Sequence, residues 1–96
     1  MEVFKYKNIT LAAPTTTVVS TGEGILHSII INKAVVSSVI TIYDGISVAL
    51  GTLIGTITLP ATLLRTQEVL TYDVALKKGL TIVTATGACN LTVSYY

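Results

Sequence analysis

The chain has 96 residues, of which 51% are hydrophobic and only 11% charged, whereas charged residues make up about 25% of a typical soluble domain. A formal net charge of +1 is too small to capture DNA or anionic lipid, so neither nucleic acid nor a membrane surface is an expected partner. The length predicts one domain, residues 1–96, whose small core cannot hide all the apolar side chains. We therefore expect self-association, most simply as a homotrimer.

Thr, Val and Ile dominate the chain and helix-forming stretches are absent, which predicts an all-β protein. Between the turn signals lie eight predicted strands: Val3–Leu11, Thr15–Val19, Ile25–Asn32, Ser38–Asp44, Thr52–Leu59, Val69–Leu76, Leu80–Thr84 and Asn90–Tyr95. Short strands at roughly ten-residue spacing with glycine turns are typical of sandwiches and barrels. We expect a two-sheet antiparallel sandwich of jelly-roll type.

Two of these strands, "SIIINK" and "TLIGTIT", are almost continuously apolar. This pattern is expected when the second sheet covers one face of a strand and a neighbouring subunit covers the other. His27 directly precedes the first of these regions, and its neighbours Ile25 and Ile29 predict an inward or interfacial side chain that is hydrogen-bonded to backbone. The alternatives for His27 are a pH sensor and a ligand site.

Two loops are unexpectedly apolar. After Asp44-Gly45 the chain reads Ile46, Ser47, Val48, Ala49 and Leu50, and the segment Leu59–Leu64 reads "LPATLL". The predicted protein-interface residues in these loops are Ile46, Val48, Leu50, Leu63 and Leu64, since burial of each side chain would contribute about 1.5–3 kcal/mol. The alternative is that one or both loops fold back over an open end of the sandwich and close its core.

The later strands alternate clearly between apolar and polar residues. One face of "VLTYDVAL" carries Leu70, Tyr72, Val74 and Leu76, and one face of "NLTVSYY" carries Leu91, Val93 and Tyr95. Aromatic residues at the end of a chain would otherwise fray into solvent. We therefore expect Tyr95 to dock in a sheet and Tyr96 to contact another chain.

No catalytic, metal-binding or cofactor-binding set is visible in the sequence. His27 is the only histidine, Cys89 is the only cysteine, and the five acidic residues are isolated from one another. We expect a protein that is not an enzyme and needs no cofactor. A single cysteine cannot form an intramolecular disulfide, and the first residues do not resemble a signal peptide, so we expect synthesis and assembly in the cytoplasm of a cell.

The string "ITIYDG…GTLIGTI…LTYDVALKKGLTIVTATG…LTVSYY" resembles small β-sandwich proteins of tailed bacteriophages. The resemblance covers Gly24 to Tyr96 and consists of strands and turns in the same order, without a catalytic signature. It implies a virion component: a capsid decoration (cement) protein that binds the major capsid protein on the capsid surface, or else a head-tail, fibre or tail-associated module that binds a receptor or glycan. In such proteins we expect a polar tip after "YDG", and the sequence "ISVAL" departs from that pattern.

Overall fold

The computed structural model describes residues 4–10, 15–33, 37–59, 62, 67–85 and 90–96, and these residues form eight strands and no helix. All eight predicted strands are present, with bounds that differ from the prediction by two residues or fewer. The strands are β1 (Lys5–Thr10), β2 (Thr15–Thr21), β3 (Gly24–Lys33), β4 (Val39–Asp44), β5 (Thr52–Thr58), β6 (Glu68–Leu76), β7 (Gly79–Ala85) and β8 (Asn90–Tyr95).

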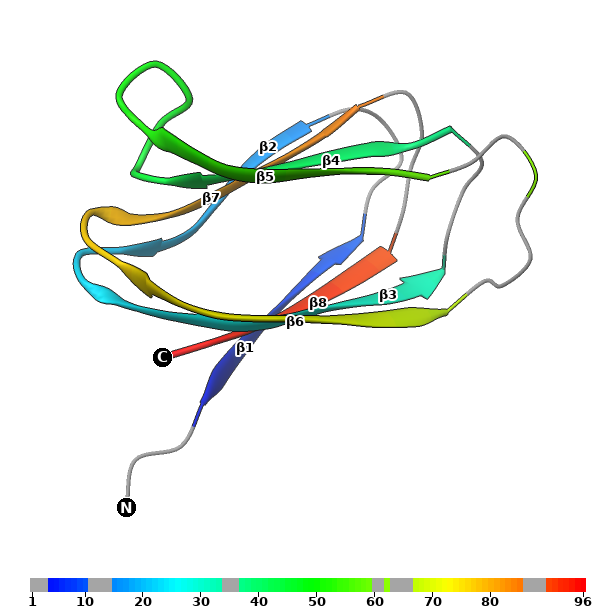
Figure 1. Ribbon diagram of the computed structural model, residues 1–96, viewed down its shortest axis with the longest axis horizontal. Helices are drawn as coiled ribbons and strands as arrows, with labels where there is room; N and C mark the ends of the chain where they lie inside the picture. The colour runs from blue at the N-terminus through cyan, green and yellow to red at the C-terminus, as the bar shows by residue number, and fades with distance from the viewer. Residues whose placement is uncertain (1–3, 11–14, 34–36, 60–61, 63–66, 86–89) are drawn as a thin grey trace.

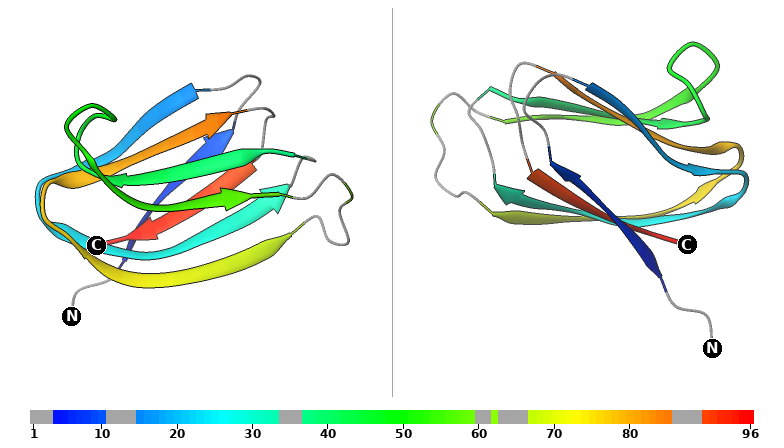
Figure 2. Two further views of the ribbon diagram at one scale, coloured as in Figure 1. Left: turned by 45° about the horizontal axis from the view of Figure 1, so that its top comes forward. Right: turned by 180° about the vertical axis from the view of Figure 1, so that it is seen from behind.

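The strands form two four-stranded antiparallel sheets that pack face to face (Figures 1 and 2). Sheet A has the order β1-β8-β3-β6 and sheet B the order β2-β7-β4-β5. Successive strands alternate between the sheets, except that β4 and β5 are neighbours in sheet B. This is the strand order of an eight-stranded jelly roll, and the predicted fold class is confirmed.

The core lies between the sheets, where every second residue of each strand points inward. Sheet A contributes mainly Leu26, Ile29, Ile31, Leu91 and Val93, and sheet B contributes mainly Ile40, Ile42, Leu80 and Ile82. Each of these side chains is at most 1% exposed. The predicted inward face of β6 is also observed, because Leu76 is buried and Leu70, Tyr72 and Val74 pack against this core.

The end of the chain is docked into sheet A. Tyr95 packs against the core, and Tyr96 exchanges two backbone hydrogen bonds with Ile25 at 2.8 and 3.0 Å. Glycine is required opposite this segment, since a Cβ atom on Gly24 would lie 2.1 Å from the Tyr96 carbonyl oxygen. The predicted docking of Tyr95 is therefore confirmed, and this contact also fixes the backbone of Tyr96.

Candidate interaction surfaces

The predicted apolar loop is solvent-exposed in the isolated chain. Side chains at its tip are 53% exposed at Ile46, 43% at Val48 and 72% at Leu50. The loop rises from the ends of β4 and β5 on the side of sheet B that faces away from sheet A (Figure 1). Thus the tip does not close the core of its own chain.

The neck of this loop is narrow and closely packed. A Cβ atom on Gly45 would lie 2.6 Å from the Cα atom of Gly51, so the two ends of the loop touch. Gly45 N–H donates to the Gly79 carbonyl at 3.1 Å, and the Thr81 hydroxyl donates to the Gly45 carbonyl at 2.7 Å. Inside the loop, Leu50 N–H donates to the Ser47 hydroxyl at 3.2 Å. This is the geometry of an Ω-loop, which holds its tip in a defined shape.

Asp44 fixes the base of the loop to the turn between β6 and β7. Its carboxylate accepts hydrogen bonds from the backbone N–H groups of Lys77, Lys78 and Gly79 at 2.9 to 3.4 Å. Desolvation raises the pKa of Asp44, but these three donors, with the nearby Lys78 charge, outweigh it and hold the pKa below its ordinary value of 3.8. Asp44 is therefore ionised near neutral pH and clamps the loop to the neighbouring turn.

The second predicted loop is described only in part. Leu59 is 7% exposed and belongs to the core, and its N–H donates to the Ser38 carbonyl at 2.8 Å. At Leu59 the alternative prediction is therefore correct, since this part of the segment belongs to the core. The candidate interface residues Leu63 and Leu64 lie outside the described residues.

An aromatic cluster that the sequence analysis missed lies on the outer face of sheet A. The Phe4 ring stacks on the His27 ring at 4.2 Å between centroids and meets the Tyr96 ring edge-on at 6.2 Å. His27 Nδ1 is hydrogen-bonded to the Asp73 carboxylate, so the predicted backbone partner for His27 is wrong. The cause is a bulge between Leu26 and Ser28, which breaks the alternation that linked Ile25 to Ile29. Ile25 is exposed and Ile29 is buried.

The outer face of sheet B carries threonine and apolar residues. Val18 and Leu53 are exposed large apolar side chains, and Thr16, Thr56 and Thr58 are exposed beside them. Asp44 is the only charged residue in the four strands of this sheet, and its carboxylate is bonded to the backbone of the next turn. The second sheet covers one face of "TLIGTIT" as expected, since Ile54 and Ile57 pack against the core, and the neighbouring subunit expected on the other face stays a prediction.

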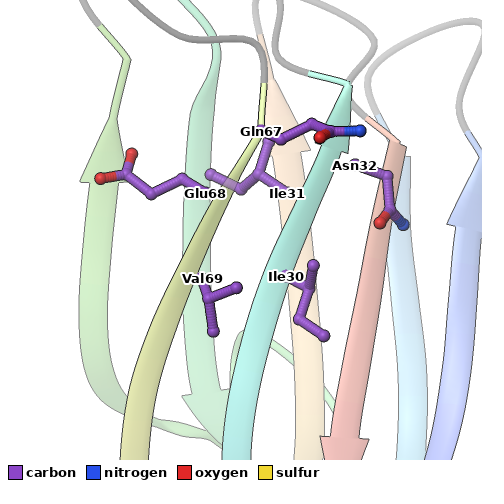
Figure 3. A pocket seen from close by; sticks show the side chains of 6 residues that line it. All are labelled: Ile30, Ile31, Asn32, Gln67, Glu68 and Val69. Carbon is purple, nitrogen blue, oxygen red and sulfur yellow. The ribbon is translucent and has the colours of Figure 1, made fainter.

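The described residues show no catalytic or metal-binding cluster. They contain no group of three or more His, Cys, Asp or Glu side chains able to hold a metal ion, and no helix long enough to cross a membrane. A shallow hollow near the end of β3 and the start of β6 is drawn in Figure 3; its lining residues are Ile30, Ile31, Asn32, Gln67, Glu68 and Val69. These side chains include no nucleophile paired with a base, so the hollow offers no evident chemistry.

No protein-family model matches the sequence, and no curated protein matches it.

Proposed function

We propose that this chain is a non-enzymatic structural protein of a phage virion, a decoration or cement protein that binds between capsomers and stabilises the assembled shell. The observation that carries the proposal is the clamped loop with its exposed apolar tip at Ile46, Val48 and Leu50. An exposed apolar tip of this kind is expected in a protein that functions while bound to a partner, which covers the tip. In the proposal the tip inserts into a gap in the major capsid protein layer.

The proposed mechanism is mass action. A protein that binds the assembled shell but not the free capsid subunits stabilises the shell by its binding free energy. The loop is already held by hydrogen bonds at Asp44, Gly45 and Thr81, so docking orders little additional backbone. Most of the apolar burial at the tip is then available for affinity.

The partners in this proposal are the major capsid protein and further copies of the same chain. Neither nucleic acid nor a membrane is among them, because the net charge is only +1 and no basic stretch occurs in the sequence. The site of action is the capsid surface, after synthesis in the cytoplasm of the host.

One observation favours a second candidate, a head-tail, fibre or tail-associated module that binds a receptor or glycan. Such a module is expected to expose aromatic side chains, and Phe4, Tyr6 and Tyr96 are exposed. They lie on a sheet face instead of on polar loops, which makes this candidate the weaker one. Counting copies per particle separates the two, since a cement protein is present in many more copies than a tail module.

The test of the proposal compares two matched substitutions, Val48→Asp at the loop tip and Val69→Asp on the outer face of sheet A, where Val69 is 62% exposed. Each protein is melted alone and then mixed with shells purified from the phage that encodes it. We expect both variants to melt like the wild type, and only Val48→Asp to lose attachment to the shells. Attachment of Val48→Asp at wild-type affinity would refute docking through the loop.

A further inference from the structure

The four edge strands of the sandwich are protected very differently. In sheet A, β1 carries Lys5 and Lys7, and β6 carries Glu68 and Asp73. In sheet B, neither β2 nor β5 carries a charge or a proline. An exposed edge strand is a template for pairing with another chain, and proteins usually block it with charges, prolines or bulges. The two edges of sheet B therefore lack the usual chemical protection.

Each of these edges has one bulge, but a regular stretch remains beside it. The irregularities lie between Val18 and Ser20 in β2 and opposite Ile42 and Tyr43 in β5. They leave Thr15–Val18 and Gly55–Thr58 regularly paired to their inner neighbours. Thr16 and Thr56 lie in the same row of the sheet, connected through Val83 and Thr41. The two free stretches therefore lie at the same level on opposite edges.

The strand directions favour pairing between unlike edges. Sheet B has four strands and every neighbouring pair is antiparallel, so β2 and β5 run in opposite directions. A second copy placed beside the first in the same orientation brings its β2 antiparallel to the first copy's β5. The same placement brings β1 antiparallel to β6, and both sheets continue across the joint.

The charges of sheet A favour the same arrangement. β5 and β6 lie on one side of the sandwich, where the Tyr72 hydroxyl would approach a Cβ atom on Gly55 to 3.4 Å, and β1 and β2 lie on the other side (Figure 1). The β6 side carries acidic Glu68, whose carboxylate points away from β3 beyond the edge (Figure 3). The β1 side carries basic Lys5 and Lys7. Pairing of like sides would bring like charges together, whereas unlike sides attract.

We propose that copies of this chain assemble side by side, with residues 55–57 of β5 on one copy paired antiparallel to residues 15–17 of β2 on the next, so that Thr56 lies opposite Thr16. The proposal deepens, and rests on, the self-association in the proposed function. Such head-to-tail contacts close into a ring when the rotation between copies permits it, and otherwise extend as an open row of copies. Main-chain hydrogen bonds would provide the affinity, and Thr16 would face Thr56 across the joint.

The test places opposite charges on the two edges of one chain. Thr56→Lys, Thr16→Asp and the double variant are compared with wild type by sedimentation over a range of concentrations. Each single change puts a charge opposite an uncharged edge, and we expect it to weaken association about tenfold or more. In the double variant the new lysine meets the new aspartate of the next copy, so we expect association to recover. The reversed pair, Thr56→Glu with Thr16→Lys, must behave in the same way.

The control is Ser94→Lys, on the central strand β8 of sheet A, which we expect to associate like wild type. Melting curves of each variant check that the fold is intact. A wild-type chain that stays monomeric, singles that associate like wild type, or a double variant as dissociated as the singles would each overturn the inference. Shell attachment is measured separately: loss of edge pairing with retained attachment refutes only the inference, and edge pairing without attachment refutes only the proposed function.

Discussion

Sheet A and sheet B bury equivalent apolar faces against one another but differ in what they present outside. The outward residues of sheet A make specific side-chain contacts, such as the chain from Asn32 through the Thr92 hydroxyl to Asn8 and the pair of His27 and Asp73. The outer face of sheet B carries mainly threonine and valine, and Asp44 is the only charged residue in the four strands of this sheet. A threonine side chain can face water or a protein partner, since its hydroxyl group forms hydrogen bonds and its methyl group packs against apolar surface. Both sheets must bury apolar side chains on their inner faces, but this requirement does not determine which residues lie on their outer faces.

The difference between the two sheets should disappear in the core that they share. Ile29→Ala in sheet A and Ile42→Ala in sheet B remove the same atoms from positions that are fully buried. We expect each to lower the free energy of unfolding by about 2–5 kcal/mol, because each leaves a cavity in the one shared core. Urea unfolding of the two variants measures this. If one loss were several times the other, the sheets would not share a single core.

The two sheets should differ clearly in how much one aspartate of each contributes to stability. Asp44 accepts hydrogen bonds from three backbone N–H groups at the end of sheet B, whereas Asp73 is exposed on sheet A and contacts the half-buried His27. We expect Asp44→Asn to lower the free energy of unfolding by about 1–2 kcal/mol, since charged hydrogen bonds are lost. For Asp73→Asn we expect less than ~1 kcal/mol, because its side chain is exposed to solvent and contacts between exposed polar side chains contribute little. Equal losses at the two positions would contradict the clamp assigned to Asp44.

Acid should remove the stabilisation that the ionised Asp44 carboxylate gives to the folded chain. Its pKa is lower in the folded chain than its ordinary value of 3.8, so the stabilisation is fully present above pH 3.8 and is lost as the pH falls through the folded value. The stability difference between wild type and Asp44→Asn should therefore shrink below about pH 3.8. Thermal melts from pH 7 to pH 2.5 measure it. A difference that stays constant over this range would show that the charge of Asp44 is not what matters.

The smallest effect should come from the aromatic cluster on sheet A. Phe4→Ala removes the ring that stacks on His27 and meets Tyr96. We expect a loss of about 0.5–1.5 kcal/mol, the range of one aromatic contact, because Phe4 is 46% exposed. The matched control is Tyr6→Ala, which is 70% exposed and should cost less. A Tyr6→Ala loss as large as that of Phe4→Ala would deny the cluster a stabilising role.

The sequence predicted the strands and the inward faces because both depend on local pattern. Alternation identified Leu70, Tyr72 and Val74 as inward, and glycine turns marked most strand ends. The environment of His27 could not be predicted, since it depends on a bulge and on which strand lies next to β3. For the same reason the unprotected edges became visible only with the strand order. The apolar sequence of the loop at Ile46–Leu50 left two positions open, exposed or folded over the core, and only the structure decided between them. The clamp by Asp44 joins residues more than thirty positions apart, so no local pattern could show it.

The position of β8 has a consequence for how fast the chain folds. β8 lies between β1 and β3, and Lys5 is paired with Tyr95 across almost the whole length of the sequence. Sheet A therefore cannot assemble in its final order until β8, which follows all the other described strands, has been inserted. Chains dominated by such distant pairings fold on the millisecond to second timescale. Until β8 arrives, β3 lacks one neighbour and β1 has none, so newly made chains pass through a period in which unpaired strands of different copies compete with the native partner.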